Sequence, residues 1–216
     1  MLKKIIKAII AIVKQLAIAF FFASLIIFVI SCFVKDKIEL GFSLINNFAV
    51  TGEYGEEVEV KFNELEKRLI NYPNYGTKFA TLIIPDMDFE EDVVHGDDLD
   101  IIKKNVGHFS GSYFPGEGGT VIIAAHNSRQ HFMYLPKVQI DSIVTIKTDY
   151  GVFNYKVYNT KIIKDTDEQE LPIQKEKEIL IMYTCYPTTT VGHKDKRYVV
   201  YAELDSVEYT GGQNES

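Results

Sequence analysis

The segment TVIIAAH, residues Thr120–His126, decides the fold class because it is an apolar run that ends on a polar side chain. Apolar runs of this length are typical of strands buried on both faces. A second run, Ile179–Cys185 (ILIMYTC), ends on a cysteine, and Tyr186-Pro187 stops the strand directly after it. The two runs therefore predict two buried strands that carry a histidine and a cysteine at their ends.

Further strand-forming segments surround these two runs. Tyr150-Gly151 is expected to form the turn of a hairpin, because a strand-like segment lies on each side of it. Short strands with few helical pieces predict a mainly β fold, either a compact barrel or a sandwich. The other expected strands are 77–85, 93–94, 142–148, 152–164 and 197–204, and helical pieces are expected near 99–106 and 128–137.

The region before the strands has an acidic, mixed composition. Glu56–Tyr72 (EEVEVKFNELEKRLINY) places apolar residues at the spacing of a helix, and the breaker-rich stretch 71–76 ends that pattern. We therefore predict a short amphipathic helix that caps the β domain. Its apolar face would consist of Val58, Phe62, Leu65 and Leu69.

The N-terminal region has the composition of a membrane anchor. Leu16–Val34 is a run of 19 residues without a charge, which as a helix spans about 30 Å of hydrocarbon. Four lysines precede it, so the positive-inside rule predicts the N-terminus inside and the rest of the chain outside. A cleaved signal peptide and a lipid attached at Cys32 are alternatives, and both also place the bulk of the chain outside the cytoplasm.

These patterns divide the chain into parts of opposite charge. Residues 1–37 hold six lysines and one aspartate, a charge of +5, so the total of −7 leaves −12 for residues 38–216. An acidic body argues against nucleic acid as a partner. The expected parts are a basic cytoplasmic lead-in (1–15), a transmembrane anchor (16–34), a stalk with the N-terminal helix (35–75), a β domain (76–205) and a polar tail (206–216).

Three reactive side chains are expected at strand ends of the β domain. Cys185 and His126 end apolar strands, and Arg197 opens the last strand. A thiolate nucleophile, an imidazole acid–base and a guanidinium that stabilises an oxyanion together suit acyl transfer. Cys32 lies in the anchor, so Cys185 has no intramolecular disulfide partner. A buried, unreactive Cys185 in an anchored binding or scaffold domain is the alternative.

Two blocks of sequence resemble the sortases, the membrane-anchored cysteine transpeptidases of Gram-positive bacteria. One is Thr184-Cys185 with Arg197 twelve positions later, and the other is Val106–His126, in which Gly-His-Phe and Pro-Gly precede the apolar strand. The chain is most similar to class D of that family, because Cys-Tyr-Pro and Arg-Tyr-Val-Val match that class. The Asp-Pro-aromatic lid of class C is absent from 38–80.

The resemblance implies a closed eight-stranded sortase-type β-barrel with short helices, preceded by an N-terminal transmembrane helix. It implies that Cys185 attacks the threonine carbonyl of an LPxTG-like sorting signal, that His126 transfers protons, and that Arg197 stabilises the oxyanion or aligns the peptide. Thr184 and Tyr186 are expected to contact substrate. The expected acceptor is an amine of the peptidoglycan or of its lipid-linked precursor, which places the enzyme in the cell membrane with its catalytic domain outside.

No metal or cofactor is expected, because neither His-Glu-x-x-His nor Cys-x-x-Cys occurs. Some sortases bind calcium at an acidic loop before the cysteine strand, but a solvated loop is the preferred interpretation here. That loop holds Asp165, Asp167, Glu168 and Glu170. Among the other histidines we expect a structural role for His108, and surface or loop positions for His95, His131 and His193. An L,D-type transpeptidase is disfavoured because its Ser-His-Gly-Cys-x-Arg block is absent.

Overall fold

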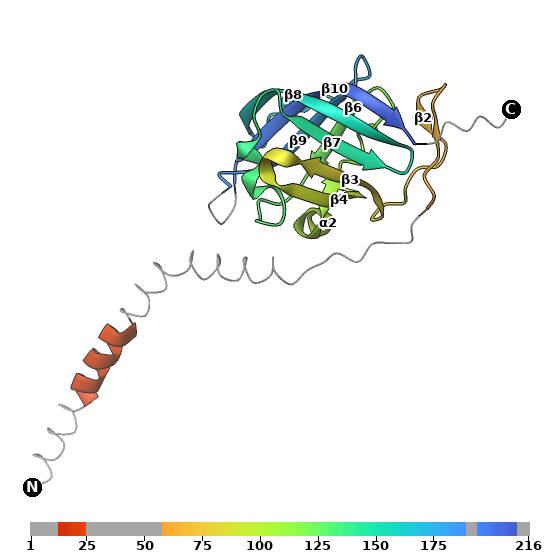
Figure 1. Ribbon diagram of the computed structural model, residues 1–216. Helices are drawn as coiled ribbons and strands as arrows, with labels where there is room; N and C mark the ends of the chain where they lie inside the picture. The colour runs from red at the N-terminus through yellow and green to blue at the C-terminus, as the bar shows by residue number, and fades with distance from the viewer. Residues whose placement is uncertain (1–12, 25–57, 189–193, 211–216) are drawn as a thin grey trace, which may run out of the picture. The chain divides into compact units, whose positions relative to one another are not determined.

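The computed structural model describes residues 13–24, 58–188 and 194–210, and the chain divides into two units, Met1–Ile45 and Asn46–Ser216 (Figure 1). In the first unit residues 13–24 are helical, and this helix lies within and just before the predicted anchor. Residues 25–34 of that predicted anchor lie outside the described residues. Among the helices that the structure describes, none has both the length and the apolar character needed to cross a membrane.

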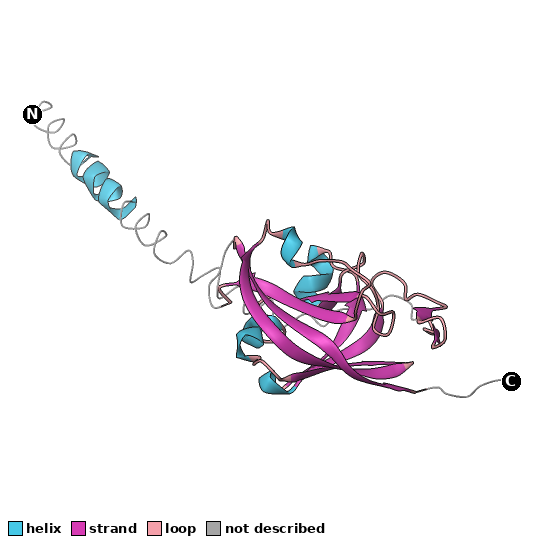
Figure 2. Ribbon diagram, turned by 90° about the horizontal axis from the view of Figure 1, so that it is seen from above, coloured by secondary structure: helices cyan, strands magenta, loops and turns pink. Residues whose placement is uncertain are grey.

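The second unit is a closed barrel of eight strands in the order β10-β8-β7-β3-β4-β5-β6-β9 (Figures 1 and 2). Its strands are β3 (Lys78–Ile84), β4 (Phe89–His95), β5 (Val106–His108), β6 (Thr120–Ala124), β7 (Ile143–Thr148), β8 (Gly151–Lys164), β9 (Ile179–Tyr186) and β10 (Lys196–Tyr209). The short helices are η1 (Pro85–Met87), α2 (Leu99–Lys104), η2 (Phe132–Lys137) and η3 (Glu168–Glu170). This confirms the mainly β fold and, of its two alternatives, the barrel.

Two strand pairs of the barrel are parallel, and one of them decides where the functional residues lie. β6 pairs in parallel with β9, so that Thr120 lies beside Ile179 and Ala124 beside Tyr183. β9 pairs with β10 in the antiparallel sense. The carboxyl ends of β6 and β9 and the start of β10 therefore meet at one end of the barrel.

Apolar side chains cover both faces of this part of the sheet. Leu180, Met182 and Val200 point into the main core inside the barrel. A second buried cluster lies on the outer face, where Phe109, Leu171 and Tyr183 pack against it. Strands buried on both faces read as continuous apolar runs, which explains the two segments that defined the fold class. The second cluster consists of Ile122, Ile163, Ile179, Ile181, Val199 and Tyr201.

The prediction of a helix over Glu56–Tyr72 is wrong for residues 58–72, the part of this segment that the structure describes. Residues 58–72 contain a two-stranded hairpin instead, β1 (Phe62–Asn63) and β2 (Arg68–Leu69). The Asn63 side chain accepts hydrogen bonds from the amides of Leu65 and Glu66 and so closes a turn. Leu65 is 96% exposed, whereas Phe62 stacks on Tyr150 of the barrel, so the apolar residues do not share one helical face.

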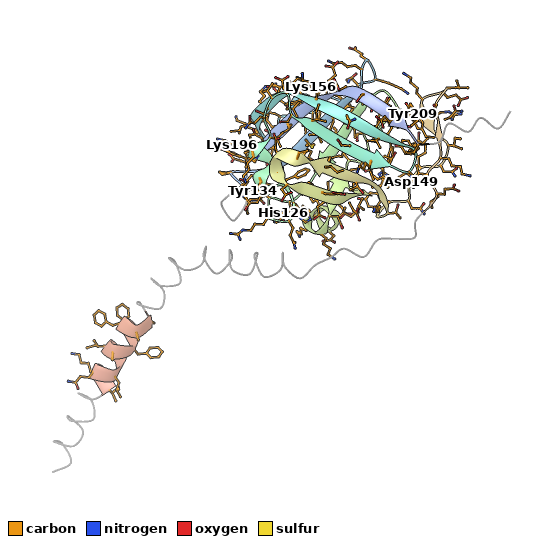
Figure 3. The ribbon with its side chains drawn as sticks, in the orientation of Figure 1. His126, Tyr134, Asp149, Lys156, Lys196 and Tyr209 are labelled. Atoms are coloured by element: carbon orange, nitrogen blue, oxygen red, sulfur yellow. The ribbon has the colours of Figure 1, made fainter. Side chains whose placement is uncertain are left out.

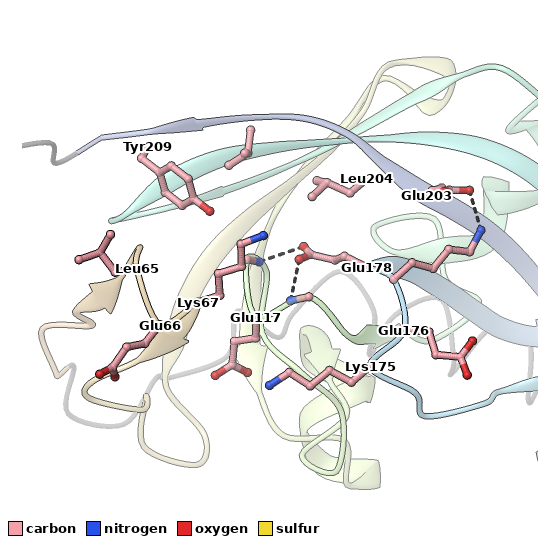
Figure 4. Close-up of a pocket in the computed structure, with 14 residues that line it drawn as sticks. Leu65, Glu66, Lys67, Glu117, Lys175, Glu176, Glu178, Glu203, Leu204 and Tyr209 are labelled. Atoms are coloured by element: carbon pink, nitrogen blue, oxygen red, sulfur yellow. Dashed lines mark hydrogen bonds and ion pairs between the residues drawn. The ribbon is translucent and has the colours of Figure 1, made fainter.

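Two buried glutamates, Glu117 and Glu178, lie at the end of the barrel where β9 begins, which is opposite to the end where β6 and β9 finish. Glu178 accepts hydrogen bonds from the amides of Gly116 and Gly118 and from the Tyr155 hydroxyl. Glu117 accepts them from the Leu69 amide, among other donors. A pocket of about 630 Å³ opens beside them and is lined by Tyr209 at the end of β10 (Figure 4). This pocket therefore lies at the far end of β9 from Cys185.

A buried histidine pair links β4 to β5. His108 is 0% exposed, and its Nδ1 lies 3.2 Å from Nδ1 of His95. Its Nε2 donates to the Tyr113 carbonyl at 2.9 Å, because a carbonyl oxygen can only accept. Burial, above all, lowers the pKa of His108 to about 3. The structural role predicted for His108 is thus confirmed.

We expect this histidine to make the fold sensitive to acid. Its pKa is lower in the folded state than in the unfolded chain, so the unfolded chain binds the extra proton and the free energy of unfolding falls as the pH drops below about 6.5. Between pH 7 and pH 5 the loss from His108 alone amounts to about 2 kcal/mol. Urea denaturation at pH 7 and at pH 5 measures this loss in the free energy of unfolding. His108→Gln should show a loss smaller by about that amount, and an unchanged loss would contradict the assignment.

Candidate active site

Cys185 and Arg197 lie side by side at the end of the barrel where β6 and β9 finish. Cys185 is the penultimate residue of β9, and Arg197 is its direct partner on β10. Directly opposite residues of an antiparallel pair project from the same face of a sheet. His126 follows β6 at the same end of the barrel, where Figure 3 labels it together with Lys196, while Asp149 and Tyr209 lie at the other end. The structure thus brings the three predicted site residues to one end of the barrel.

Hydrogen bonds on both sides of His126 fix it relative to Cys185. The Thr184 hydroxyl donates to the Ala125 carbonyl at 2.9 Å, and the Asn127 side-chain amide donates to the Thr188 carbonyl at 3.2 Å. The residues that flank the histidine are therefore tied to residues on both sides of the cysteine. The backbone amide of His126 also donates to the Ile102 carbonyl at 3.1 Å, which anchors the histidine to α2.

The guanidinium group of Arg197 is held in place by backbone oxygens. Its Nη1 donates to the carbonyls of Lys194 and Lys196, each at 2.9 Å. Its Nη2 lies 3.8 Å from the Asp165 carboxylate, which is an ion pair at longer than hydrogen-bond distance. The Arg197 side chain is 23% exposed, so part of the group remains accessible. A fixed, partly accessible cation beside a thiol is the arrangement that oxyanion stabilisation requires.

The environment of His126 keeps its imidazole neutral. Burial is the largest effect and lowers the pKa of His126, and the positive charges of Lys194 and Lys103 lower it further. A histidine with a pKa below its ordinary value of about 6.5 is mostly neutral at pH 7. It can then accept a proton from an incoming group.

The cysteine itself is accessible. Cys185 is a free thiol of intermediate exposure, whereas a purely structural cysteine is usually fully buried. Tyr186, the next residue, is also partly exposed, and its ring centroid lies 6.1 Å from that of Tyr198. Thr184, in contrast, is 1% exposed. That burial favours a structural tie over the substrate contact expected for Thr184.

Two of the three remaining histidines, His95 and His131, lie within the described residues. His131 lies in the turn before η2, which is a loop position as predicted, but it is only 6% exposed, and its Nδ1 lies 2.9 Å from the Ser128 hydroxyl. His95 is partly buried in the pair with His108. His193 lies outside the described residues.

The acidic loop before β9 is engaged by neighbouring groups. Asp165 faces Arg197, Asp167 accepts from the Lys164 amide, and Glu170 pairs with Lys161 at 2.6 Å. Among the residues that the structure describes, no cluster of three or more histidine, cysteine or acidic side chains is arranged to hold a metal ion. Three of the four carboxylates of this loop, those of Asp165, Asp167 and Glu170, thus have protein partners.

Two residues of the site carried no signal in the sequence. Lys194 is only 9% exposed and lies where the chain enters β10. The Asn127 side chain joins the His126 loop to Thr188, the residue after Pro187. Both act across contacts between distant parts of the chain, so no local spacing could have singled them out.

A closed β-barrel that brings an accessible cysteine, a histidine and an arginine to one end defines the class of a cysteine-nucleophile enzyme. The Sortase domain profile matches residues 82–205, which is more than half of the chain, and the chain therefore belongs to the sortase family. That family consists of cysteine transpeptidases.

Individual relatives agree with this assignment. The chain is 34% identical to Sortase D of Bacillus subtilis over 131 residues. The aligned stretch covers 61% of this chain and 66% of that protein, which is just under two thirds of its length. The structure of a Sortase D5 transpeptidase from Clostridium perfringens superposes with a TM-score of 0.56 at 24% identity, over 62% of this chain and 82% of that one. The structure of a sortase C from Clostridium perfringens superposes with a TM-score of 0.54 at 25% identity, over 62% of this chain and 72% of that one.

Proposed function

We propose that the chain is a membrane-anchored cysteine transpeptidase that cleaves an LPxTG-like sorting signal between threonine and glycine. It then joins the released carboxyl end to a cell-wall amine through a thioacyl intermediate on Cys185. The observation that carries the proposal is the direct pairing of Cys185 with Arg197, next to a histidine that Thr184 and Asn127 tie to the same strand end. A nucleophile, an oxyanion donor and an acid–base are the three groups that acyl transfer needs.

The first half-reaction forms the thioacyl enzyme. The Cys185 sulfur attacks the threonine carbonyl carbon, and the resulting oxyanion is stabilised by the Arg197 guanidinium, which is oriented by the carbonyls of Lys194 and Lys196. The peptide C–N bond then breaks. Neutral His126 takes the proton of the Cys185 thiol as the sulfur attacks, and it then gives that proton to the departing glycine amine, which leaves the imidazole neutral again.

The second half-reaction transfers the acyl group. The acceptor amine attacks the thioester carbonyl, and neutral His126 takes a proton from that amine as the new C–N bond forms. The C–S bond breaks and the Cys185 thiolate is regenerated. Because burial and two lysines lower the pKa of His126, the neutral form that this step needs predominates at pH 7.

The outer face of β9 beside Cys185 suits the apolar part of a sorting signal. Phe109, Leu171 and Tyr183 lie partly buried on the outer cluster, and Tyr183 is two residues before Cys185 on β9, so these residues offer apolar surface on the face from which Cys185 projects. Leucine and proline side chains of a substrate would lose water there, at about 25 cal/mol per Å² of buried apolar area. Tyr186, which is partly exposed, would contact the same peptide, while Thr184 would hold the strand ends together.

The location follows from the N-terminal sequence. Leu16–Val34 would cross the membrane once, with Lys3, Lys4, Lys7 and Lys14 on the cytoplasmic side. The catalytic domain would then face the cell wall, where sorting signals and amine acceptors occur together. The expected acceptor is an amine of the peptidoglycan or of its lipid-linked precursor.

The test is a transpeptidation assay on the full chain in detergent. The substrates are LPxTG-type peptides varied one position at a time, with a peptidoglycan-derived amine as acceptor, and products are identified by mass. We expect cleavage between threonine and glycine and a product joined to the amine. An anchored scaffold domain would cleave none of these peptides, and its Cys185 would resist alkylation in the folded protein. That pair of results would rule the enzyme out.

A further inference from the structure

His131 is a buried histidine close to His126 in the chain that the reaction sequence above does not use. It is 6% exposed, and its Nδ1 lies 2.9 Å from the hydroxyl of Ser128, which is 1% exposed. A buried polar pair of this kind holds the chain in one arrangement, because other arrangements leave a buried group without a partner. The pair therefore fixes the segment that directly follows His126.

The His126 loop, residues 126–132, folds back on itself. The amide of Phe132 donates to the carbonyl of His126 at 3.0 Å, and the amides of His131 and Met133 each donate to the Ser128 carbonyl at 3.1 Å. Phe132 is 0% exposed and belongs to the main core. A core residue thus holds the His126 carbonyl, and the pair of Ser128 and His131 closes the loop between them.

The end of α2 binds the same loop at two points. The last carbonyls of a helix have no partner within the helix, so they are free to accept from elsewhere. The Ile102 carbonyl accepts from the His126 amide at 3.1 Å. The backbone of Lys104, the last residue of α2, hydrogen-bonds the His131 imidazole. His131 therefore joins the loop to the helix end that also holds His126.

The partners of His131 suit a neutral imidazole. In that form one ring nitrogen donates and the other accepts. The Lys104 carbonyl can only accept, so it takes the ring N–H, and Nδ1 accepts from the Ser128 hydroxyl. Burial is the largest effect and lowers the pKa of His131, and a protonated His126 lowers it further. His131 thus stays neutral and keeps both bonds while His126 carries a proton.

We propose that His131 is a positioning residue, which holds the His126 loop so that the His126 imidazole stays in reach of Cys185. A catalytic side chain must be kept within about 0.5 Å and 10–20° of its productive geometry. The backbone of His126 is bonded at its amide and at its carbonyl, and His131 fixes the residues between those two bonds. This proposal rests on the proposed function, since it assumes that His126 transfers protons.

The test measures kcat and KM for cleavage of an LPxTG-type peptide by the full chain in detergent. His131→Phe keeps a ring in place but removes its hydrogen bonds, and Ser128→Ala removes the pair from the other partner. We expect each variant to lower kcat about tenfold and to keep KM within about twofold of the parent, because a displaced acid–base slows proton transfer without weakening peptide binding. The double variant should be no slower than His131→Phe, since both changes remove one interaction.

Tyr155→Phe is the matched control. It also puts phenylalanine in place of a hydrogen-bonding ring, and it removes the 2.7 Å bond to Glu178 at the end of the barrel where β9 begins. Tyr155 is 0% exposed, so this variant should lower the urea midpoint as His131→Phe does. Its kcat should equal that of the parent.

Urea midpoints verify folding, and Ser128→Ala decides alone if His131→Phe does not fold. Parent-like kcat in the folded variants, an equal loss of kcat in Tyr155→Phe, or losses that add up in the double variant would overturn the positioning role. A parent chain that cleaves no sorting peptide would instead refute the proposed function, and the positioning role with it.

Discussion

Cys185→Ala is expected to lower kcat/KM for sorting-peptide cleavage by at least about 10⁴-fold, because loss of a covalent nucleophile removes the whole thioacyl route. The fold should survive, since Cys185 is only partly buried and alanine leaves little empty space. Steady-state cleavage on the full chain gives the rate, and urea unfolding at pH 7 checks the fold.

Cys185→Ser provides the comparison, because it keeps the size of the side chain but lacks a readily formed anion. It should be almost as inactive as the alanine variant. Cleavage by Cys185→Ala at a rate close to that of the parent would mean that another group carries the chemistry. The assignment of Cys185 would then be wrong.

Arg197→Met is expected to lower kcat/KM by about 10²–10³-fold, because removal of one oxyanion donor costs an enzyme about that much in kcat. Cys185 should keep its thiol, so the loss should fall mainly on kcat. Arg197→Lys should recover part of the activity, because lysine keeps the charge but lacks the planar fork that bonds both the Lys194 and Lys196 carbonyls.

Arg68→Met is the matched control for Arg197→Met. Arg68 is exposed, pairs with Glu66, and belongs to the hairpin whose Leu65 and Lys67 line the pocket at the other end of the barrel (Figure 4). Its loss should leave kcat and KM unchanged. If Arg197→Met were as active as Arg68→Met, the oxyanion role would have to be assigned elsewhere.

The sequence predicts the strands of this fold well where burial on both faces leaves a continuous apolar pattern. Thr120–Ala124 and Ile179–Tyr186 are the examples, and both form strands. Their parallel pairing is a long-range property, so the residues alone left a barrel and a sandwich open. The resemblance to the sortases supplied the closed barrel.

Predictions failed where contacts between distant segments override local spacing. The predicted helix over 56–72 is replaced by a hairpin because Phe62 packs on Tyr150 and Leu69 donates its amide to Glu117. Asn127 and Lys194 likewise join the site through tertiary contacts. The three strand-end residues were predictable because rigid strands end at fixed places.

The proposed reaction requires a covalent bond between the Cys185 sulfur and the threonine carbonyl carbon of a sorting signal. Intact mass spectrometry of the full chain, quenched in acid shortly after mixing with an LPxTG-type peptide without an acceptor amine, tests that bond. We expect an added mass equal to the peptide fragment that ends in threonine. The adduct should map to Cys185, be released by hydroxylamine and be absent from Cys185→Ala. Peptide cleavage with no adduct on Cys185, or an adduct on another residue, would contradict it.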